Sequence, residues 1–224
     1  MVSASSYCND AVFYSSGIST PTTPKRHPTA QRLLEVAIDA IDAGGESALR
    51  LDVIVEKAGV AITAVYHHFG NREGLMEAAQ AERYIRTVWP LVRLTGERLT
   101  LVSDPEDLKM TVLTILDASL DPEFATNRLR RLNVVGSTLG RPRLAEAVTA
   151  EQARVNQHLA EALQPFQDQG LIRAEVDLLA FSSWVFGVIL SRAIVELEPD
   201  DENARAWDQV TRQAFMALLF GDLA

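Results

Sequence analysis

Apolar residues recur at the spacing of an amphipathic α-helix in one segment after another, and this pattern constrains the fold most. Leu34, Ala37, Ile38 and Ile41 stand at i, i+3, i+4 and i+7, on one face of a helix that opens at Pro28–Thr29, with Thr29 as candidate N-cap. No segment shows the sustained two-residue alternation of a strand. The sequence therefore predicts an all-α protein. Helices are expected over residues 28–43, 51–58, 60–69, 71–90, 105–119, 121–138, 142–169, 175–197 and 201–220.

These segments divide the chain into three parts. Residues 1–24 are rich in Ser, Thr, Asn, Gly and Pro and have no period, which predicts a flexible tail. Residues 25–75 hold three short helices with a tight turn at Gly59, the pattern of a helix-turn-helix domain. Residues 76–224 form a larger helical bundle domain.

Charge and cysteine content narrow the classes of function. The 224 residues carry a formal net charge of −9, which disfavours a nucleic-acid binder unless a small basic face lies on an acidic body. The single cysteine, Cys8, excludes a disulfide framework within the chain. Residues 1–27 lack the features of a secretory signal, and the longest uncharged stretch, Leu178–Ser191, is shorter than the roughly 18 residues of a membrane span. We expect a cytoplasmic protein with no membrane partner.

One stretch carries a recognisable motif. It reads Ala-Gly-Val at 58–60, Tyr-His-His-Phe at 66–69 and Arg-Glu-Gly-Leu at 72–75. Together these residues, in this register, resemble the DNA-binding domain of the TetR family of regulators, and the likeness extends over about residues 29–79. Gly59 supports it independently, because glycine adopts the left-handed conformation of such a turn at low cost.

The resemblance implies that the third short helix enters the major groove of DNA. Val60, Val65 and Phe69 would anchor this helix, so that Thr63 meets base edges and Tyr66 meets a phosphate. Ile62 or Ala61 would contact a thymine methyl group, and Arg72 would bind a second phosphate. The expected DNA-binding residues are Arg26, Arg32, Arg50, Ala61, Ile62, Thr63, Tyr66, His67 and Arg72.

Two features depart from the family pattern. Arg50 stands where the family has Thr or Ser, which would cap the second helix through its hydroxyl group; an arginine cannot cap in this way but can reach a phosphate. Between Lys25 and Glu77 there are six basic and eight acidic residues, so that affinity for DNA must come from the placement of the basic groups.

In the larger domain the resemblance implies a dimer interface and a pocket for a small-molecule effector. Two copies would pair through the last two helices and bind a palindromic operator. Repression is the commoner role in the family, so that the effector is expected to release the protein from its operator or shift it there. The expected interface residues are Phe181, Trp184, Val185, Val188, Trp207 and Phe215. The mixture of aromatic and apolar residues around the expected pocket favours an apolar or aromatic effector. The expected pocket residues are Tyr84, Val88, Trp89, Met110, Leu113, Asp117, Phe124, Asn133 and Phe166.

Other classes of function have less support in the sequence. His67 and His68 are adjacent on a helix and point about 100° apart, and no cluster of ligands completes a metal site, so that no metal or cofactor is expected. No nucleophile–base arrangement or phosphate-binding loop is recognisable, so that an enzyme is not expected. The alternative that the acidic charge balance leaves open is a helical small-molecule-binding or scaffold protein without DNA binding.

Overall fold

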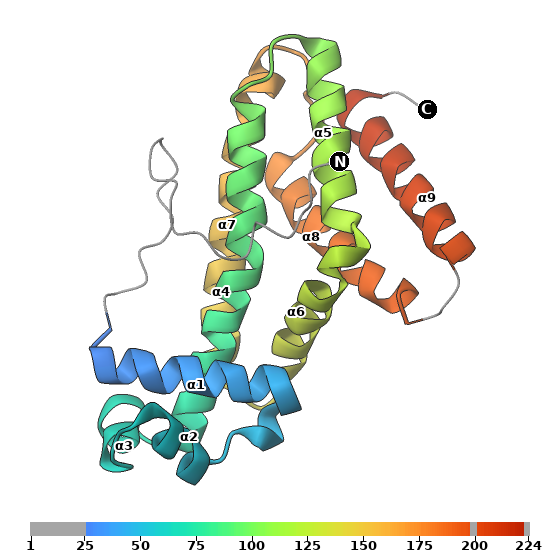
Figure 1. The fold of residues 1–224 in the computed structure, drawn as a ribbon. Helices are drawn as coiled ribbons and strands as arrows, with labels where there is room; N and C mark the ends of the chain where they lie inside the picture. The colour runs from blue at the N-terminus through green and yellow to red at the C-terminus, as the bar shows by residue number, and fades with distance from the viewer. Residues whose placement is uncertain (1–25, 198–200, 222–224) are drawn as a thin grey trace.

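A computed structural model describes residues 26–197 and 201–221, and within these residues the secondary structure is helical, with no strand (Figure 1). This confirms the predicted all-α fold; the expected tail, residues 1–24, lies outside the described residues. The elements are α1 (Pro28–Gly44), η2 (Glu46–Ala48), α2 (Leu51–Ala58), α3 (Thr63–Phe69), α4 (Arg72–Leu99), α5 (Pro105–Leu120), η3 (Pro122–Phe124), α6 (Ala125–Ser137), α7 (Pro142–Asp168), α8 (Leu178–Val195) and α9 (Asp201–Phe220).

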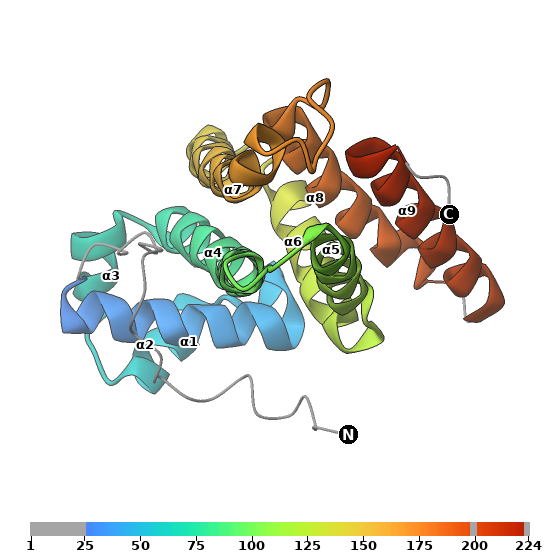
Figure 2. The same cartoon turned by 90° about the horizontal axis from the view of Figure 1, so that it is seen from above.

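The long helix α4 connects the two halves of the molecule. Helices α1, α2 and α3 are grouped around the N-terminal end of α4, and α7 runs beside it (Figures 1 and 2). Helix α6 also packs against α4, whereas α8 and α9 lie on the side of the molecule away from α1 (Figure 2). A movement of α4 therefore affects both halves.

Several helices are capped at their N-terminus by a side chain that accepts a hydrogen bond from a backbone N–H of the first turn. Asn71 accepts a hydrogen bond from the Gly74 backbone N–H at 2.8 Å, which confirms it as the N-cap of α4. The cap of α1 is His27 rather than Thr29, because the His27 Nδ1 accepts from the Thr29 N–H at 3.2 Å. Arg50 makes no capping bond to α2, as its chemistry requires, yet α2 still begins at Leu51.

Several helix boundaries differ from the sequence-based expectation: α3 begins at Thr63 instead of residue 60, and α6 begins at Ala125 after the separate turn η3. Helix α4 continues to Leu99 with Pro90 inside it, because Trp89 and Val92 on either side of the proline are buried in the core. Packing here outweighs the usual cost of an internal proline, about 3 kcal/mol. Helix α8 begins at Leu178 instead of residue 175, because the Asp177 carboxylate caps it by accepting from the N–H groups of the next residues.

Buried apolar residues form one cluster around α1–α3 and two in the larger bundle. The first cluster includes Leu75, Met76 and Ala79 of α4, whereas Tyr84 and Val88 one turn later belong to the larger bundle. The expected domain boundary at residue 75 thus falls inside α4, which contributes to both cores.

Helix α8 is long and apolar enough to cross a membrane by length and composition alone, although its uncharged run was expected to be too short. Its packing gives another reason for its composition. Phe181, Val185 and Ile189 are buried in the core of the bundle, and Arg192 is buried and pairs with Asp208 of α9 at 2.7 Å. An apolar helix packed in this way is the core helix of a globular bundle.

Candidate DNA-binding and ligand-binding sites

Helix α3 is anchored by one face and exposed on the other. Val65 is fully buried, and Val60 and Phe69 pack against the same N-terminal core. Ile62 and Tyr66 are 44% and 53% exposed, so that these two large side chains lie on the face of α3 away from the core. Five of the expected DNA-binding residues lie on the exposed part of this short helix and the turn before it: Ala61, Ile62, Thr63, Tyr66 and His67.

Two glycines fix the turns on either side of α3. Gly59 ends α2 with φ 63° and ψ 41°, the left-handed conformation expected at this position. Gly74 is required for a different reason: a Cβ atom at this position would lie 2.0 Å from the carbonyl oxygen of Phe69. The first turn of α4 therefore packs directly on the backbone at the end of α3, which sets the direction of α3.

The structure gives the expected phosphate-binding arginines different surroundings. The Arg72 guanidinium donates to the Leu49 carbonyl at 2.8 Å and to the Glu46 carbonyl at 3.0 Å, so that it braces the start of the helix-turn-helix. Arg50 is exposed and pairs with Asp52 at 2.8 Å, and Arg26 lies 3.8 Å from a carboxylate of α4. Arg32 is exposed and has no ion pair among the described residues. Arg32 thus keeps its full charge available for a partner.

Three histidines lie next to each other at the edge of the domain. The rings of His27 and His68 stack with centroids 5.2 Å apart, and His67 meets His68 edge-on at 4.7 Å. Partial desolvation, together with the neighbouring imidazoles of His67 and His27, lowers the pKa of His68. Within the described parts of the chain no group of three or more His, Cys, Asp or Glu side chains could hold a metal ion.

A polar network joins the DNA-binding half to the bundle. Arg141, in the turn between α6 and α7, donates two hydrogen bonds to the Glu46 carboxylate, at 2.9 and 2.8 Å, and a third to Glu73. The other oxygen contacts of Glu46 come from Gln80 at 2.8 Å and Ser137 at 2.5 Å. Burial raises the pKa of Glu46, but these hydrogen bonds and the charge of Arg141 outweigh it, and the net pKa is below 4.5.

A second set of contacts lies beside this network. Arg83 of α4 binds Asp42 of α1 at 2.7 Å and donates to Asn133 of α6 at 2.9 Å. Arg130 of α6 pairs with the same aspartate at 3.3 Å. The α1–η2 region is thus hydrogen-bonded to α6 as well as to α4.

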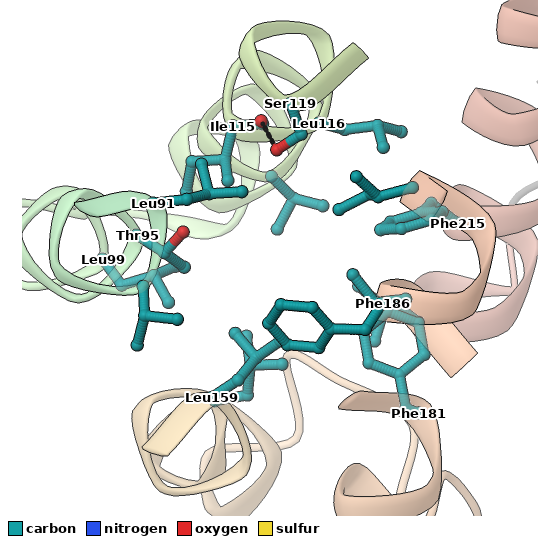
Figure 3. A pocket seen from close by; sticks show the side chains of 16 residues that line it. Leu91, Thr95, Leu99, Ile115, Leu116, Ser119, Leu159, Phe181, Phe186 and Phe215 are labelled. Carbon is teal, nitrogen blue, oxygen red and sulfur yellow. Dashed lines mark hydrogen bonds between the residues drawn. The ribbon is translucent and has the colours of Figure 1, made fainter. Parts of the chain in front are cut away.

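A cavity of about 60 Å³ lies inside the larger bundle, between α4, α5, α7, α8 and α9 (Figure 3). Thr95 and Ser119 are its only polar lining residues, and the Ser119 hydroxyl donates to the Ile115 carbonyl at 2.7 Å. Figure 3 shows Phe186 and Phe181 extending toward the cavity from α8, with Leu159 below and Leu91 and Thr95 opposite. The site is apolar and is lined by side chains from five helices.

None of the expected effector-binding residues lines this cavity. Tyr84, Val88 and Trp89 are buried in a neighbouring cluster, whereas Met110 and Phe124 are exposed. Asp117 faces α9, where it pairs with Arg212 at 2.6 Å, and Asn133 accepts a hydrogen bond from Arg83. Phe166 packs against the edge of the core, and Leu113 is half-buried. The expected effector-binding residues on α4, α5 and α7 thus lie on helices that border the cavity, whereas Asn133 of α6 and Phe124 of η3 lie on elements that do not.

The expected dimer residues divide into two groups. Phe181, Val185 and Phe215 are buried within the single chain and line the cavity. Trp184 is 37% exposed, and Val188 and Trp207 are half-buried. Sequence reasoning missed the apolar residues of these helices that are most exposed: Leu179, Ile194, Val210 and Leu218.

The structure thus combines a helix-turn-helix domain with a larger helical domain that encloses an apolar cavity. Residues 33–79 match the family model for bacterial regulatory proteins of the tetR family. A stretch of 62 residues is 37% identical to the HTH-type transcriptional regulator SrpR of Pseudomonas putida, covering 28% of this chain and 29% of that protein. The chain therefore matches less than a third of the length of this curated relative.

Solved structures resemble almost the whole described fold. A TetR-family regulator from Mesorhizobium loti aligns with a TM-score of 0.65 at 18% identity, covering 86% of this chain and 96% of that one. GusR of Salmonella enterica aligns with a TM-score of 0.58 at 21% identity, covering 90% and 99% of the two chains. NemR of E. coli, in its reduced form, gives 0.62 at 13% identity, covering 86% and 98%. Residues 33–79 therefore match the DNA-binding domain of tetR-family regulators, and the fold as a whole resembles that of these solved structures.

Proposed function

We propose that the protein is a transcription regulator that binds operator DNA by inserting α3 into the major groove. The observation that carries this proposal is the exposure of Ile62, Thr63 and Tyr66 on a short helix whose opposite face, at Val65, is fully buried. A helix held in this way presents its N-terminal side chains to base edges. Arg32, exposed and without an ion pair among the described residues, is the best-placed expected cation for a phosphate.

The active unit that we propose is a homodimer formed through α8 and α9. Ala206, Val210 and Leu218 are spaced along one exposed face of α9, and Trp184 is the exposed aromatic residue of α8. Exposed apolar stripes on neighbouring helices are typical of a helix-bundle interface. Two-fold symmetry of the dimer predicts a palindromic operator.

The same proposal includes a small-molecule effector that binds in the cavity. The cavity volume of about 60 Å³ is well below the roughly 300–1,000 Å³ of ordinary ligand sites, so that an effector must displace the lining helices to enter. Leu91, Val92 and Thr95 belong to α4, the helix that also carries Leu75 of the DNA-binding core. Displacement of α4 would change the position of α3, and release of a repressor from its operator is the expected result.

The location that fits this role is the cytoplasm, where the operator lies. The competing proposal is a helical ligand-binding or scaffold protein that has no DNA activity, which the net charge of −9 favours. The two proposals differ in one property, a salt-sensitive affinity for duplex DNA.

A pair of charge-matched variants tests the DNA-binding role. Arg32→Ala and Arg93→Ala each remove one exposed cation, but Arg32 lies on α1 of the DNA-binding domain and Arg93 lies on α4 within the larger domain. For a selected duplex, we expect Arg32→Ala to reduce the slope of log K against log salt by about 0.9, and Arg93→Ala to leave it unchanged. Equal slopes for both variants would contradict a phosphate contact by Arg32. If the wild-type protein bound no duplex, the competing proposal would be favoured.

A further inference from the structure

Arg131 of α6 is a buried cation without a hydrogen-bonding partner. Its side chain lies in the core with the residue only 4% exposed, and its Nε and Nη1 atoms are buried with no acceptor. No carboxylate of the described residues pairs with it within 4 Å. Buried guanidinium groups are normally paired and hydrogen-bonded, because an isolated buried charge is costly.

The preceding turn of α6 shows how this fold satisfies a buried arginine. Arg128 is fully buried and donates to the Ser119 carbonyl at 2.8 Å and to the Asp121 carbonyl at 3.0 Å, and it also binds the Glu196 carboxylate. Arg131 lies three residues later on the same buried face and has no equivalent partners. Its difference from Arg128 therefore indicates that its acceptor comes from outside the chain.

Arg131 does not itself line the apolar cavity, but neighbouring residues connect its surroundings to residues that do. Ser119, which lines the cavity, is the residue whose carbonyl Arg128 binds, and Arg131 is one helical turn from Arg128. Val92 and Phe186 line the cavity and also belong to the cluster that contains Tyr84. Tyr84 and Arg131 are both buried; burial raises the pKa of the Tyr84 phenol, and the positive charge of Arg131 lowers it in part.

Tyr84 cannot supply the missing negative charge. Burial is the main cause that raises the pKa of its phenol to about 12, and Arg131 offsets only part of this effect. The phenol is therefore neutral at pH 7, and its hydroxyl donates to Gln152. Burial lowers the pKa of Arg131 to about 10, so that the guanidinium remains charged at neutral pH.

We propose that Arg131 binds the carboxylate of an amphipathic effector whose aliphatic or aryl part occupies the neighbouring cavity. A carboxylate matches the paired N–H groups of a guanidinium, and the cavity lining of leucine, valine, isoleucine and phenylalanine side chains matches an apolar chain. This inference rests on the proposed function, since it names the chemical class of the effector. It replaces a neutral apolar ligand with a monoanionic one.

The test compares compounds that share a chain and differ in the head group. Octanoate, octanol and octylamine are titrated into the full-length protein by calorimetry at pH 7.5, with acetate as the head group alone. We expect octanoate to bind the wild-type protein at least about tenfold tighter than octanol, the value of a charged hydrogen bond. Acetate is expected to bind much more weakly than octanoate, because it lacks the apolar chain.

Variants show whether Arg131 causes the preference. Arg131→Met should abolish the preference for octanoate over octanol, and the melting temperature of the ligand-free variant should be unchanged or higher, because an unpaired buried charge is removed. Arg131→Lys keeps the charge but loses the paired N–H geometry, so that its preference for octanoate over octanol should be reduced but not lost. This variant replaces Arg131→Met in the test if the methionine variant does not fold. Arg93→Met removes an exposed cation from α4 and is the charge-matched control, with the preference retained.

Several results would overturn the inference. These are equal affinities of octanoate and octanol for the wild-type protein, a preference that persists in Arg131→Met, equal binding of acetate and octanoate, or no binding of any octyl compound. Operator binding, measured on the same preparation, distinguishes failure of this inference from failure of the proposed function. If operator binding persists, only the effector class is wrong; if it is absent, the proposed function fails as well.

Discussion

The contact between Arg141 and Glu46 is expected to couple the folding of the two halves of the molecule. Arg141 comes from the turn between α6 and α7, and its two hydrogen bonds of 2.9 and 2.8 Å to Glu46 reach the residue that opens η2. The side chains are 20% and 27% exposed, so that water screens their interaction only in part. A charged hydrogen-bonded pair is worth about 1.5–3 kcal/mol when buried and less than about 1 kcal/mol at the surface.

From this exposure we expect a coupling energy of about 1–2 kcal/mol. The free energy of unfolding of Arg141→Met, Glu46→Gln and the double variant would be measured in urea at one protein concentration, since a dimer's stability depends on it. For a chain of this size the same loss lowers the melting temperature by about 2–8 °C. The double-variant cycle isolates the pair from the other contacts of each residue.

The ion pair between Arg212 and Asp117 provides a matched control. Its N···O distance is 2.6 Å, but its side chains are 40% and 48% exposed, so that its coupling should be below about 0.5 kcal/mol. A coupling between Arg141 and Glu46 that is no larger than this control would refute the reasoning. In that case the polar network would not connect the DNA-binding half to the bundle energetically.

Three further perturbations have defined outcomes. Gly74→Ala should lower the free energy of unfolding by about 1–3 kcal/mol or more and weaken DNA binding, because the added Cβ would lie 2.0 Å from the Phe69 carbonyl oxygen. Gly136→Ala is the control, since the space around its Cβ is open, and its free energy of unfolding should not fall. Urea titration of both variants measures the difference. Trp184→Asp should convert a dimer to a monomer in sedimentation velocity, whereas Leu101→Asp, at an exposed position in the turn after α4, should not. The pKa of Glu46 is lower in the folded protein than its ordinary 4.5, so that its stabilisation is present at neutral pH and is lost as pH falls below 4.5; the acid loss of stability should be shallower in Glu46→Gln, and an identical pH profile would contradict this.

The helix pattern and the helix-turn-helix could be predicted from the sequence because local signals determine them. Asn71 caps α4 and Gly59 adopts the left-handed turn, as their residue types indicate. The end of α4 could not be predicted from Pro90, because long-range packing of Trp89 and Val92 continues the helix past it. The helix-breaking propensity of a residue such as Pro90 is overridden when its neighbours on both sides are buried in the core.

The cavity was less predictable than the fold. Periodicity identifies that a helix has an apolar face, but it does not distinguish residues that fill the core from those that border a void. Phe181 and Phe215, which periodicity places on the apolar faces expected at a dimer interface, are buried within the single chain and line the cavity. Arg131 was missed for the same reason: an arginine in an amphipathic helix is ordinarily exposed, and only its burial without a partner distinguishes it.

The most direct test of the account is selection of bound fragments from a genomic duplex pool, followed by a salt titration of the selected site. The account predicts enrichment of a palindrome whose affinity falls steeply with salt, and a loss of affinity at every salt concentration in Tyr66→Phe. If the full-length protein enriched no fragment at low salt, with or without cell extract as an effector source, the claim that α3 reads an operator would be contradicted.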